Sequence, residues 1–300
     1  MGAIELEHVT QRFGDIVALS DVSVTFAENR ITGLLGRNGS GKSTLLDLVS
    51  AHRLPTSGEV RVSGRQPFES RDVLRQVCAI TEAQSYPGKY SVSAVLRAAS
   101  WLYPTWDAAL ADDLADQFGL RQGQLVDKLS RGQRSAVGVI IGLASRSPVT
   151  LLDEPYVGLD AVARQLFYDR LLEAYADQPR TIVLSSHLID EVADLLEHVV
   201  VLDAGRVVAD VATDDLRYGV LALTGPTVVV DDICSELEVL HRTALAGTTR
   251  VLVRGADAGI AARLGLRAER LTLQQVVVAM AGHQPPPADA PAPRTIGALS

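Results

Sequence analysis

Residues 36–43 read GRNGSGKS, which matches the pattern G-x-x-x-x-G-K-[ST]. A short apolar run at residues 31–35 precedes this stretch, and an apolar-periodic segment at residues 43–49 follows it. A strand, a glycine turn and a helix in this order open an α/β nucleotide-binding fold. The stretch therefore predicts an α/β protein with a parallel sheet.

The chemistry of this loop is phosphate binding. Glycines let the backbone curl so that several N–H groups point at phosphate oxygens, and the positive end of the following helix adds to the field. Lys42 supplies a positive charge to the β- and γ-phosphates, the Ser43 hydroxyl can ligate Mg²⁺, and the Thr44 hydroxyl can reach a phosphate oxygen. The loop residues predicted to bind the nucleotide are Gly36, Arg37, Asn38, Gly39, Ser40, Gly41, Lys42, Ser43 and Thr44.

A second predicted strand ends in two carboxylates. Residues 149–154 read VTLLDE, and ligands of parallel sheets lie at the carboxyl ends of the strands. We expect Asp153 to hold Mg²⁺, directly or through water. Glu154, one residue further, would orient or deprotonate an attacking water near the γ-phosphate.

Residues 129–133, LSRGQ, lie about twenty residues before the acidic pair. Ser130 followed three residues later by Gln133 is a capping box, which starts a helix. A capped helix start is also a place where anions bind, so the structural and the functional interpretation predict the same local structure.

The remaining chain divides into three predicted parts. Residues 1–212 form the ATPase domain, in which a mostly helical subdomain spans about residues 88–145. Residues 213–282 form a small α+β accessory domain, and residues 283–300, rich in Pro and Ala, are expected to be disordered.

Composition restricts the partners and the compartment. The net charge of −8 argues against broad nucleic-acid binding, which needs clustered Lys and Arg. Cys78 and Cys234 are far apart and in no metal-like spacing, which suits a reduced, cytosolic protein. The first residues are unlike a signal peptide, and no apolar run approaches the roughly 18 residues of a membrane span. Membrane association is therefore expected to go through a partner.

The order of the motifs resembles one family. Across residues 3–212 the sequence is similar to the ATPase subunits of ABC transporters, which carry a phosphate loop, a glutamine-bearing loop, an L-S-G-G-Q signature, Asp-Glu after a strand, and then a loop with Asp and a switch histidine. Here the last two match Asp160 and His187. Phe13 matches the aromatic residue that stacks on adenine.

The resemblance implies a P-loop NTPase fold of the ABC type and a mechanism. Two such domains face head to tail, and each ATP lies between one phosphate loop and the other subunit's signature. The resemblance implies that Ser130, Gly132 and Gln133 bind ATP across this interface. It also implies catalysis by Glu154 and His187 together with Lys42 of the phosphate loop.

The resemblance also implies the partners and the location. We expect an integral membrane permease, and either a homodimer or a heterodimer with a paralogous ATPase. The protein would be cytoplasmic and peripheral on the inner face of the cell membrane. Residues 103–107, YPTWD, also resemble exporter ATPases of Gram-positive bacteria.

Three positions depart from the family pattern. The third signature residue is Arg131 instead of Gly, and its side chain is expected to point away from the nucleotide. In the loop that usually carries glutamine, Glu82 occupies the usual position and Gln84 follows two residues later, so either could be the Mg²⁺ ligand. Tyr156 replaces a small residue after Asp-Glu-Pro, a change expected to affect packing.

Aromatic residues gather at residues 86–90 and 101–107 in a chain that is only 5% aromatic. They either pack within the helical subdomain or form a groove for a cytoplasmic helix of the membrane subunit.

Two alternative functions fit the sequence less well. A soluble ABC ATPase of translation usually carries two ATPase domains, and one of DNA repair carries a very long coiled coil between the phosphate loop and the signature. This chain has one set of motifs, and residues 44–128 contain no sustained heptads. A degenerate subunit that binds ATP without hydrolysing it is disfavoured because Lys42, Asp153, Glu154 and His187 are all present.

Overall fold

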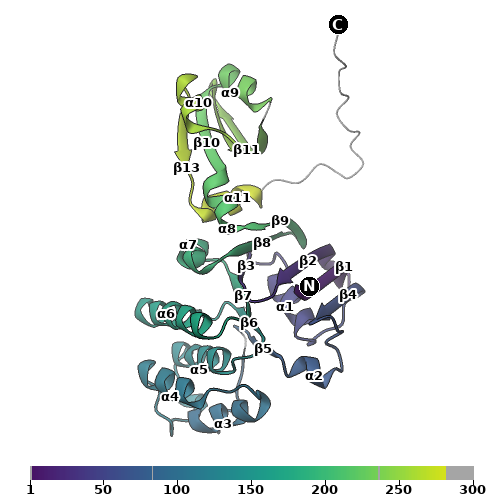
Figure 1. Ribbon diagram of the computed structural model, residues 1–300, viewed down its shortest axis with the longest axis vertical. Coiled ribbons are helices and arrows are strands. Elements are labelled where there is room, and N and C mark those ends of the chain that lie inside the picture. The colour runs from purple at the N-terminus through teal and green to yellow at the C-terminus, as the bar shows by residue number, and fades with distance from the viewer. Residues whose placement is uncertain (1, 83, 236, 282–300) are drawn as a thin grey trace.

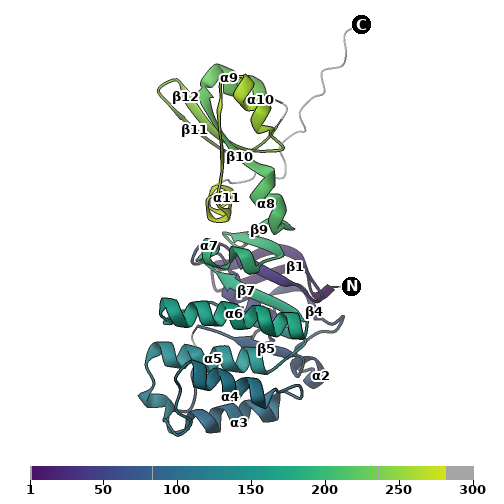
Figure 2. The same cartoon turned by 60° about the vertical axis from the view of Figure 1, so that its left-hand side comes forward.

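The computed structural model describes residues 2–82, 84–235 and 237–281. The tail predicted to be disordered, residues 283–300, lies outside the described residues. Figures 1 and 2 show three tiers along the long axis, with a helical block at one end, two β-sheets in the middle and a C-terminal sheet at the other end.

The central tier is built on a six-stranded sheet in the order β5-β6-β7-β3-β8-β9. Adjacent strands of this sheet run parallel, except at one edge, where β9 runs antiparallel to β8. A two-residue turn at Ala204 and Gly205, both with positive φ, joins that last pair and so forces the antiparallel direction. The strands are β5 (Val77–Ile80), β6 (Val149–Asp153), β7 (Thr181–Ser186), β3 (Ile31–Leu35), β8 (His198–Asp203) and β9 (Arg206–Ala212).

The two faces of this sheet bury alternate side chains of the same strands. Leu34, Val183 and Val200 belong to one hydrophobic cluster together with α1 (Lys42–Val49). Their neighbours along the strands belong to the other cluster, which contains α5 (Arg131–Ala144) and α6 (Ala161–Asp177). Helices therefore cover both faces, as the continuous apolar strands predict.

A second, antiparallel sheet covers α1 from the other side. Its order is β2-β1-β4, from β2 (Ile16–Ala27), β1 (Gly2–Phe13) and β4 (Ser57–Val62). The short helix α2 (Arg71–Leu74) leads into β5.

The helical tier contains α3 (Val92–Leu102) and α4 (Ala108–Gln117), which pack with α5. Ser91 and Asp107 cap the first two helices by accepting backbone N–H groups. Helix α4 ends at Gln117, and Phe118 is its C-cap. Gly119 follows with a φ of 64°, as expected of a residue that ends a helix.

The C-terminal tier is a four-stranded antiparallel sheet in the order β11-β12-β10-β13. One of its faces has a cluster of its own around Leu221 and Leu223, whereas Val220 and Ala222 join the main core. The elements are α8 (Thr213–Gly219), β10 (Val220–Pro226), α9 (Thr227–Cys234), β11 (Glu238–Leu245), β12 (Thr248–Arg254), α10 (Ala258–Arg263), β13 (Arg267–Arg270) and α11 (Leu273–Met280). The predicted boundary between the first domain and the accessory domain, between residues 212 and 213, stays a proposal.

The C-terminal tier contacts the central tier beside α7 (Ile189–Val192). The Gln274 backbone N–H donates to the Asp190 carboxylate over 3.0 Å, and Arg217 pairs with Asp194 at 2.7 Å. Helix α7 begins two residues after His187, so the accessory sheet is connected to the segment that carries the predicted switch histidine.

None of the helices within the described residues is both long enough and apolar enough to cross a membrane.

Candidate functional site

The phosphate loop lies where β3 ends and α1 begins, and two of its glycines are required for different reasons. At Gly36 the φ is 151°, and a Cβ would lie 2.2 Å from the Leu202 carbonyl oxygen. At Gly39 the φ is 80°, but a Cβ would meet no atom within 4 Å. Gly36 therefore allows the loop to pack closely against β8, whereas Gly39 allows a turn that is exposed to solvent.

Lys42 is the first residue of α1 and is only 6% exposed. Its ammonium donates to the carbonyls of Gly36 and Arg37 over 2.9 and 3.1 Å, so it bridges the base of the loop. Burial lowers the pKa of Lys42, and the charges of Glu154 and Asp153 oppose that shift. The Lys42 ammonium can form charge-assisted hydrogen bonds to phosphate oxygens.

The loop and the acidic pair share one cavity of about 280 Å³. Its lining combines backbone of the loop, hydroxyl groups, one cation and three carboxylates. The lining residues are Ala18, Asn38, Gly39, Gly41, Lys42, Ser43, Thr44, Glu82, Asp153 and Glu154. Residues separated by more than a hundred positions in the sequence thus meet at one edge of the parallel sheet.

Asp153 ends β6, and its carboxylate accepts a hydrogen bond of 2.6 Å from the Ser185 hydroxyl on the neighbouring strand β7. The two residues are directly paired in the strand register. This bond fixes one carboxylate oxygen, while the side chain is 5% exposed toward the cavity.

Glu154 has a φ of 50°, a left-handed conformation that non-glycine residues adopt mainly where the surrounding structure imposes it. The residue is 8% exposed, and its carboxylate atom Oε2 accepts from Nδ1 of His187 over 2.7 Å. A carboxylate can only accept, so Nδ1 carries the proton and Nε2 faces away from Glu154. The predicted base and the predicted switch histidine are therefore in direct contact.

The Tyr156 hydroxyl is a third member of this cluster. It hydrogen-bonds to Glu154, and it lies 2.8 Å from the Ser186 hydroxyl. Burial and the bond to Glu154 raise the pKa of Tyr156, so its hydroxyl stays protonated and can donate. Sequence reasoning assigned only packing to this residue and no role to Ser185 or Ser186. The sequence does contain a signal for the two serines, because their hydroxyl groups stand at the end of a predicted strand, directly before His187.

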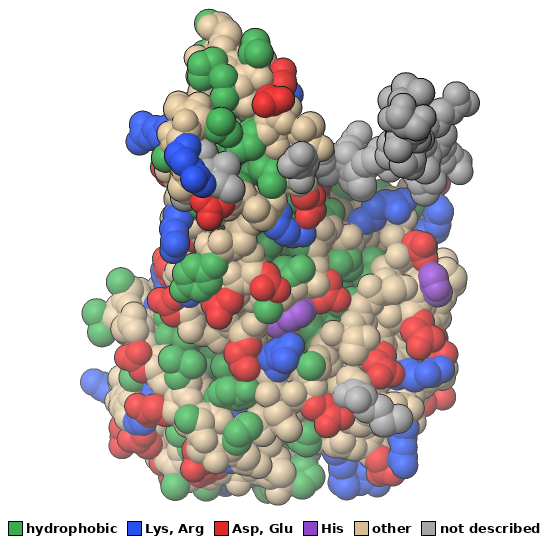
Figure 3. Space-filling view, turned by 45° about the horizontal axis from the view of Figure 1, so that its top comes forward, with side chains coloured by type: hydrophobic (Ala, Val, Ile, Leu, Met, Phe, Trp, Pro, Cys, Tyr) green, Lys and Arg blue, Asp and Glu red, His purple; other side chains and the backbone are tan. Residues whose placement is uncertain are grey.

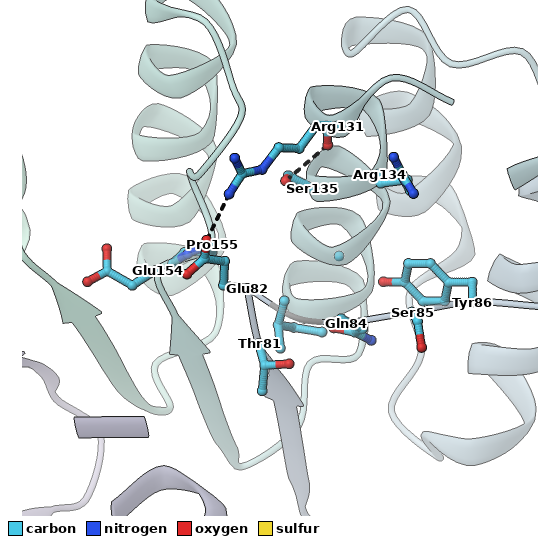
Figure 4. Close-up of a pocket in the computed structure, with 12 residues that line it drawn as sticks. Thr81, Glu82, Gln84, Ser85, Tyr86, Arg131, Arg134, Ser135, Glu154 and Pro155 are labelled. Carbon is cyan, nitrogen blue, oxygen red and sulfur yellow. Dashed lines mark hydrogen bonds and ion pairs between the residues drawn. The ribbon is translucent and has the colours of Figure 1, made fainter. Parts of the chain in front are cut away.

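Two of the departures from the family pattern meet in space. The Arg131 guanidinium pairs with the Glu82 carboxylate at 2.8 Å, reaching from α5 as Figure 4 shows. Glu82 also lines the phosphate-loop cavity, whereas Gln84 lines a neighbouring cavity of about 360 Å³. Of the two candidate metal ligands, Glu82 is thus the one beside Lys42 and Asp153, and its role stays a prediction.

The predicted signature residues lie outside the phosphate-loop cavity. Ser130 and Gln133 form the predicted capping box at the start of α5, with both reciprocal hydrogen bonds present. Gly132 is packed against the backbone of Gly158, where a Cβ would lie 2.4 Å from the carbonyl oxygen. Asp160 caps α6 by accepting from the Ala163 N–H over 2.8 Å.

Phe13 is also absent from the residues described around that cavity. It ends β1 with 38% of its surface exposed, and the Arg53 guanidinium lies 4.9 Å from its ring centroid. A partly exposed aromatic ring can stack on a base.

A family model for ABC transporters matches residues 19–157. The glycine betaine uptake system ATP-binding protein YehX of Escherichia coli (strain K12) is 35% identical over 68% of this chain and 69% of its own length. The ABC transporter ATP-binding protein YtrB of Bacillus subtilis (strain 168) is 26% identical over 71% of this chain and 73% of its own.

Solved structures agree with these relatives. One described as the ATP-binding subunit of an ABC transporter is similar with a TM-score of 0.65 and 25% identity, over 72% of this chain and 92% of that one. The expected P-loop fold of the ABC type is confirmed. The expected exporter-like, Gram-positive subgroup stays a prediction, since a relative from Escherichia coli carries the name of an uptake system.

The contrast between two loop glycines yields a stability prediction. Gly36→Ala should lower the free energy of unfolding by about 3 kcal/mol, because its backbone conformation and its clash with Leu202 both oppose a side chain. Gly39→Ala should lower it by about 1 kcal/mol, from backbone strain alone. Urea unfolding of both variants without nucleotide measures the difference. Equal losses would contradict the packing of the loop against β8.

Proposed function

Because the chain belongs to the family of ATP-binding subunits of ABC transporters, we propose that it hydrolyses ATP at an interface between two such subunits. Hydrolysis to ADP and phosphate would energise transport through a separate membrane subunit. One observation carries the proposal. Lys42, Asp153 and Glu154 share a cavity with the phosphate loop, and His187 hydrogen-bonds to Glu154.

The residues present fit ATP and Mg²⁺. The Ser40 hydroxyl is buried in the phosphate loop without a partner among the described residues, as a group awaiting a ligand would be. No group of three or more His, Cys, Asp or Glu in the described part of the chain could hold a metal by itself. Ser43 and Asp153 would therefore share the ion with phosphate oxygens, which is the usual mode of Mg²⁺ binding. When bound, the ion neutralises charge that develops on the phosphates.

Residues of this chain would then have separate roles in ATP hydrolysis. Lys42 and the loop N–H groups orient the phosphates and hold their charge. Glu154 accepts a proton from the attacking water, since it is the carboxylate one residue beyond the metal ligand Asp153. His187 holds Glu154 through Nδ1, and Nε2 would have to carry a second proton to donate to a γ-phosphate oxygen.

A second subunit would complete the site. Ser130, Gly132 and Gln133 are partly or fully exposed at the start of α5 and contribute nothing to the phosphate-loop cavity described in their own chain. Their N-terminal helix position suits an anion, and we propose that the anion is the γ-phosphate held by the facing subunit. Asp160 would lie in the same interface. The partner is a second copy or a paralogous ATPase.

The membrane subunit would dock on the helical tier. The aromatic residues there divide into two sets, because Tyr86, Tyr103 and Trp106 pack against the core, whereas Tyr90 and Trp101 are 50% and 77% exposed. Exposed aromatic residues are frequent anchors at interfaces. A permease bound at this patch would hold the protein at the inner face of the membrane. Export is the direction that we propose, from the resemblance of residues 103–107.

The soluble alternatives, an ABC ATPase in translation or DNA repair, are not favoured. Both relatives described above are named as ATP-binding proteins of transport systems. On the face shown in Figure 3, acidic and basic side chains are interspersed instead of separating into a basic area that could follow a nucleic-acid backbone.

The role of Glu154 is tested by phosphate release. Glu154→Gln keeps the size of the side chain but removes the base, so the rate should fall by at least about 100-fold. Glu173→Gln, an exposed position on α6, serves as the matched control and should keep the wild-type rate. A Glu154→Gln variant that hydrolyses ATP like the control would remove Glu154 from the mechanism.

Docking is tested by co-purification. Tyr90→Ala and Trp101→Ala should weaken retention of the membrane subunit while sparing hydrolysis by the isolated ATPase. Tyr218→Ala, which removes an aromatic residue 64% exposed on the C-terminal tier, is the control. If both helical-tier variants retain the membrane subunit as well as the wild type does, the patch is not the docking site.

A further inference from the structure

Tyr156 is among the largest fully buried side chains described, at 1% exposure, and it lies in the loop between β6 and α6. Its ring packs under the guanidinium of Arg164, 5.8 Å from the ring centroid, and 6.2 Å from the His187 ring. The ring is therefore held in place by its neighbours, which fixes the position of its hydroxyl.

The direction of each hydrogen bond at this hydroxyl follows from proton counting. The Ser186 hydroxyl oxygen accepts from the Leu188 N–H over 2.9 Å, so its own proton is available to Tyr156 at 2.8 Å. The His187 N–H also donates to the Tyr156 oxygen, over 3.3 Å. The single proton of Tyr156 then goes to its one described acceptor, the Glu154 carboxylate.

Both donors to Glu154 act on the same atom. The Tyr156 hydroxyl and His187 Nδ1 both donate to Oε2. A glutamate carboxylate with one donor can still turn about that bond, whereas a second donor to the same oxygen holds that oxygen in place. Neither donor uses the other oxygen, Oε1, which would be open to accept a proton from a water in the phosphate-loop cavity that Glu154 lines.

We propose that Tyr156 is a positioning residue for ATP hydrolysis, whose hydroxyl fixes the Glu154 carboxylate and ties it to the backbone of the switch segment at His187. This inference rests on the proposed function, in which Glu154 accepts the proton. Tyr156 itself touches neither water nor phosphate in this role. It acts by keeping Glu154 in a geometry that productive proton transfer needs.

Packing alone does not require the hydroxyl. A buried hydroxyl is unfavourable unless its hydrogen bonds are made, and phenylalanine would fill the same volume without that requirement. The hydroxyl at this site has three described partners, and each of them belongs to the acidic pair or to the segment of residues 186–187.

The test replaces Tyr156 by Phe, which keeps the ring. The kcat for ATP hydrolysis should fall about 10-fold, the effect of losing one hydrogen bond to the reacting group, with KM for ATP within twofold of wild type. Tyr168→Phe is the matched control, since Tyr168 is 6% exposed and its hydroxyl donates to the carboxylate of Glu191, on the neighbouring helix α7. The control should keep kcat and KM, and thermal unfolding verifies that both variants fold.

Two further readouts separate positioning from packing. In nucleotide-free protein, the ring ¹⁵N signal of His187, assigned with His187→Gln, should shift in Tyr156→Phe and stay in place in Tyr168→Phe. In a Glu154→Gln background, Tyr156→Phe should lower residual hydrolysis no further, because its effect passes through that carboxylate.

The outcomes distinguish two failures. If wild-type protein hydrolyses ATP and Glu154→Gln does not, but Tyr156→Phe stays within twofold of the wild-type kcat, the inference about Tyr156 is overturned. A full additional 10-fold loss in the Glu154→Gln background also overturns it. If Glu154→Gln retains wild-type hydrolysis, the proposed function fails instead.

Discussion

The register of three neighbouring parallel strands is the constraint on which the site depends. Leu35 at the end of β3 pairs with Ser186, and Asp153 at the end of β6 pairs with Ser185, so the phosphate loop, the switch segment and the acidic pair all leave the sheet at one edge. A shift of one strand by one residue would turn its side chains to the opposite face and separate these groups. The alternating clusters on the two faces hold the register, and the Ser185 bond to Asp153 connects two strand ends directly.

The same geometry explains why one chain carries only half of the proposed site. The phosphate loop, Glu154 and His187 belong to the strand ends, whereas Ser130 and Gln133 belong to the start of α5, a helix that covers one face of the sheet. The Glu82–Arg131 pair connects these two parts within one chain. Both partners are exposed by half or more, so the pair contributes about 0–1 kcal/mol to folding. Its consequence is geometric, because it links the loop that lines the nucleotide cavity to the first turn of the signature helix.

Local patterns predicted much of this arrangement and long-range contacts explain what they missed. Residues 31–35, the helix starting at Lys42 and the capping box at Ser130 carry their signals in neighbouring residues, and the structure agrees with each. The pairing of β1 with β2 and β4 depends on distant segments, and helix α9 contains three valines that favour strands. The partners of the Tyr156 hydroxyl are likewise separated in sequence, because Ser186 lies thirty residues from Tyr156 and the two meet only through the sheet.

The central claim is that ATP joins two subunits through the signature helix. It is tested most directly by sedimentation, with ATP and Mg²⁺, of the Glu154→Gln variant and of the double variant that also carries Ser130→Asp. Aspartate caps a helix as well as serine does, but its charge would repel a γ-phosphate. The account predicts a dimer with ATP, a monomer with ADP, and a monomer that still binds ATP once Ser130→Asp is added. A dimer that persists with Ser130→Asp would contradict it, and a chain that stays monomeric with ATP bound would contradict pairing between two copies of this chain.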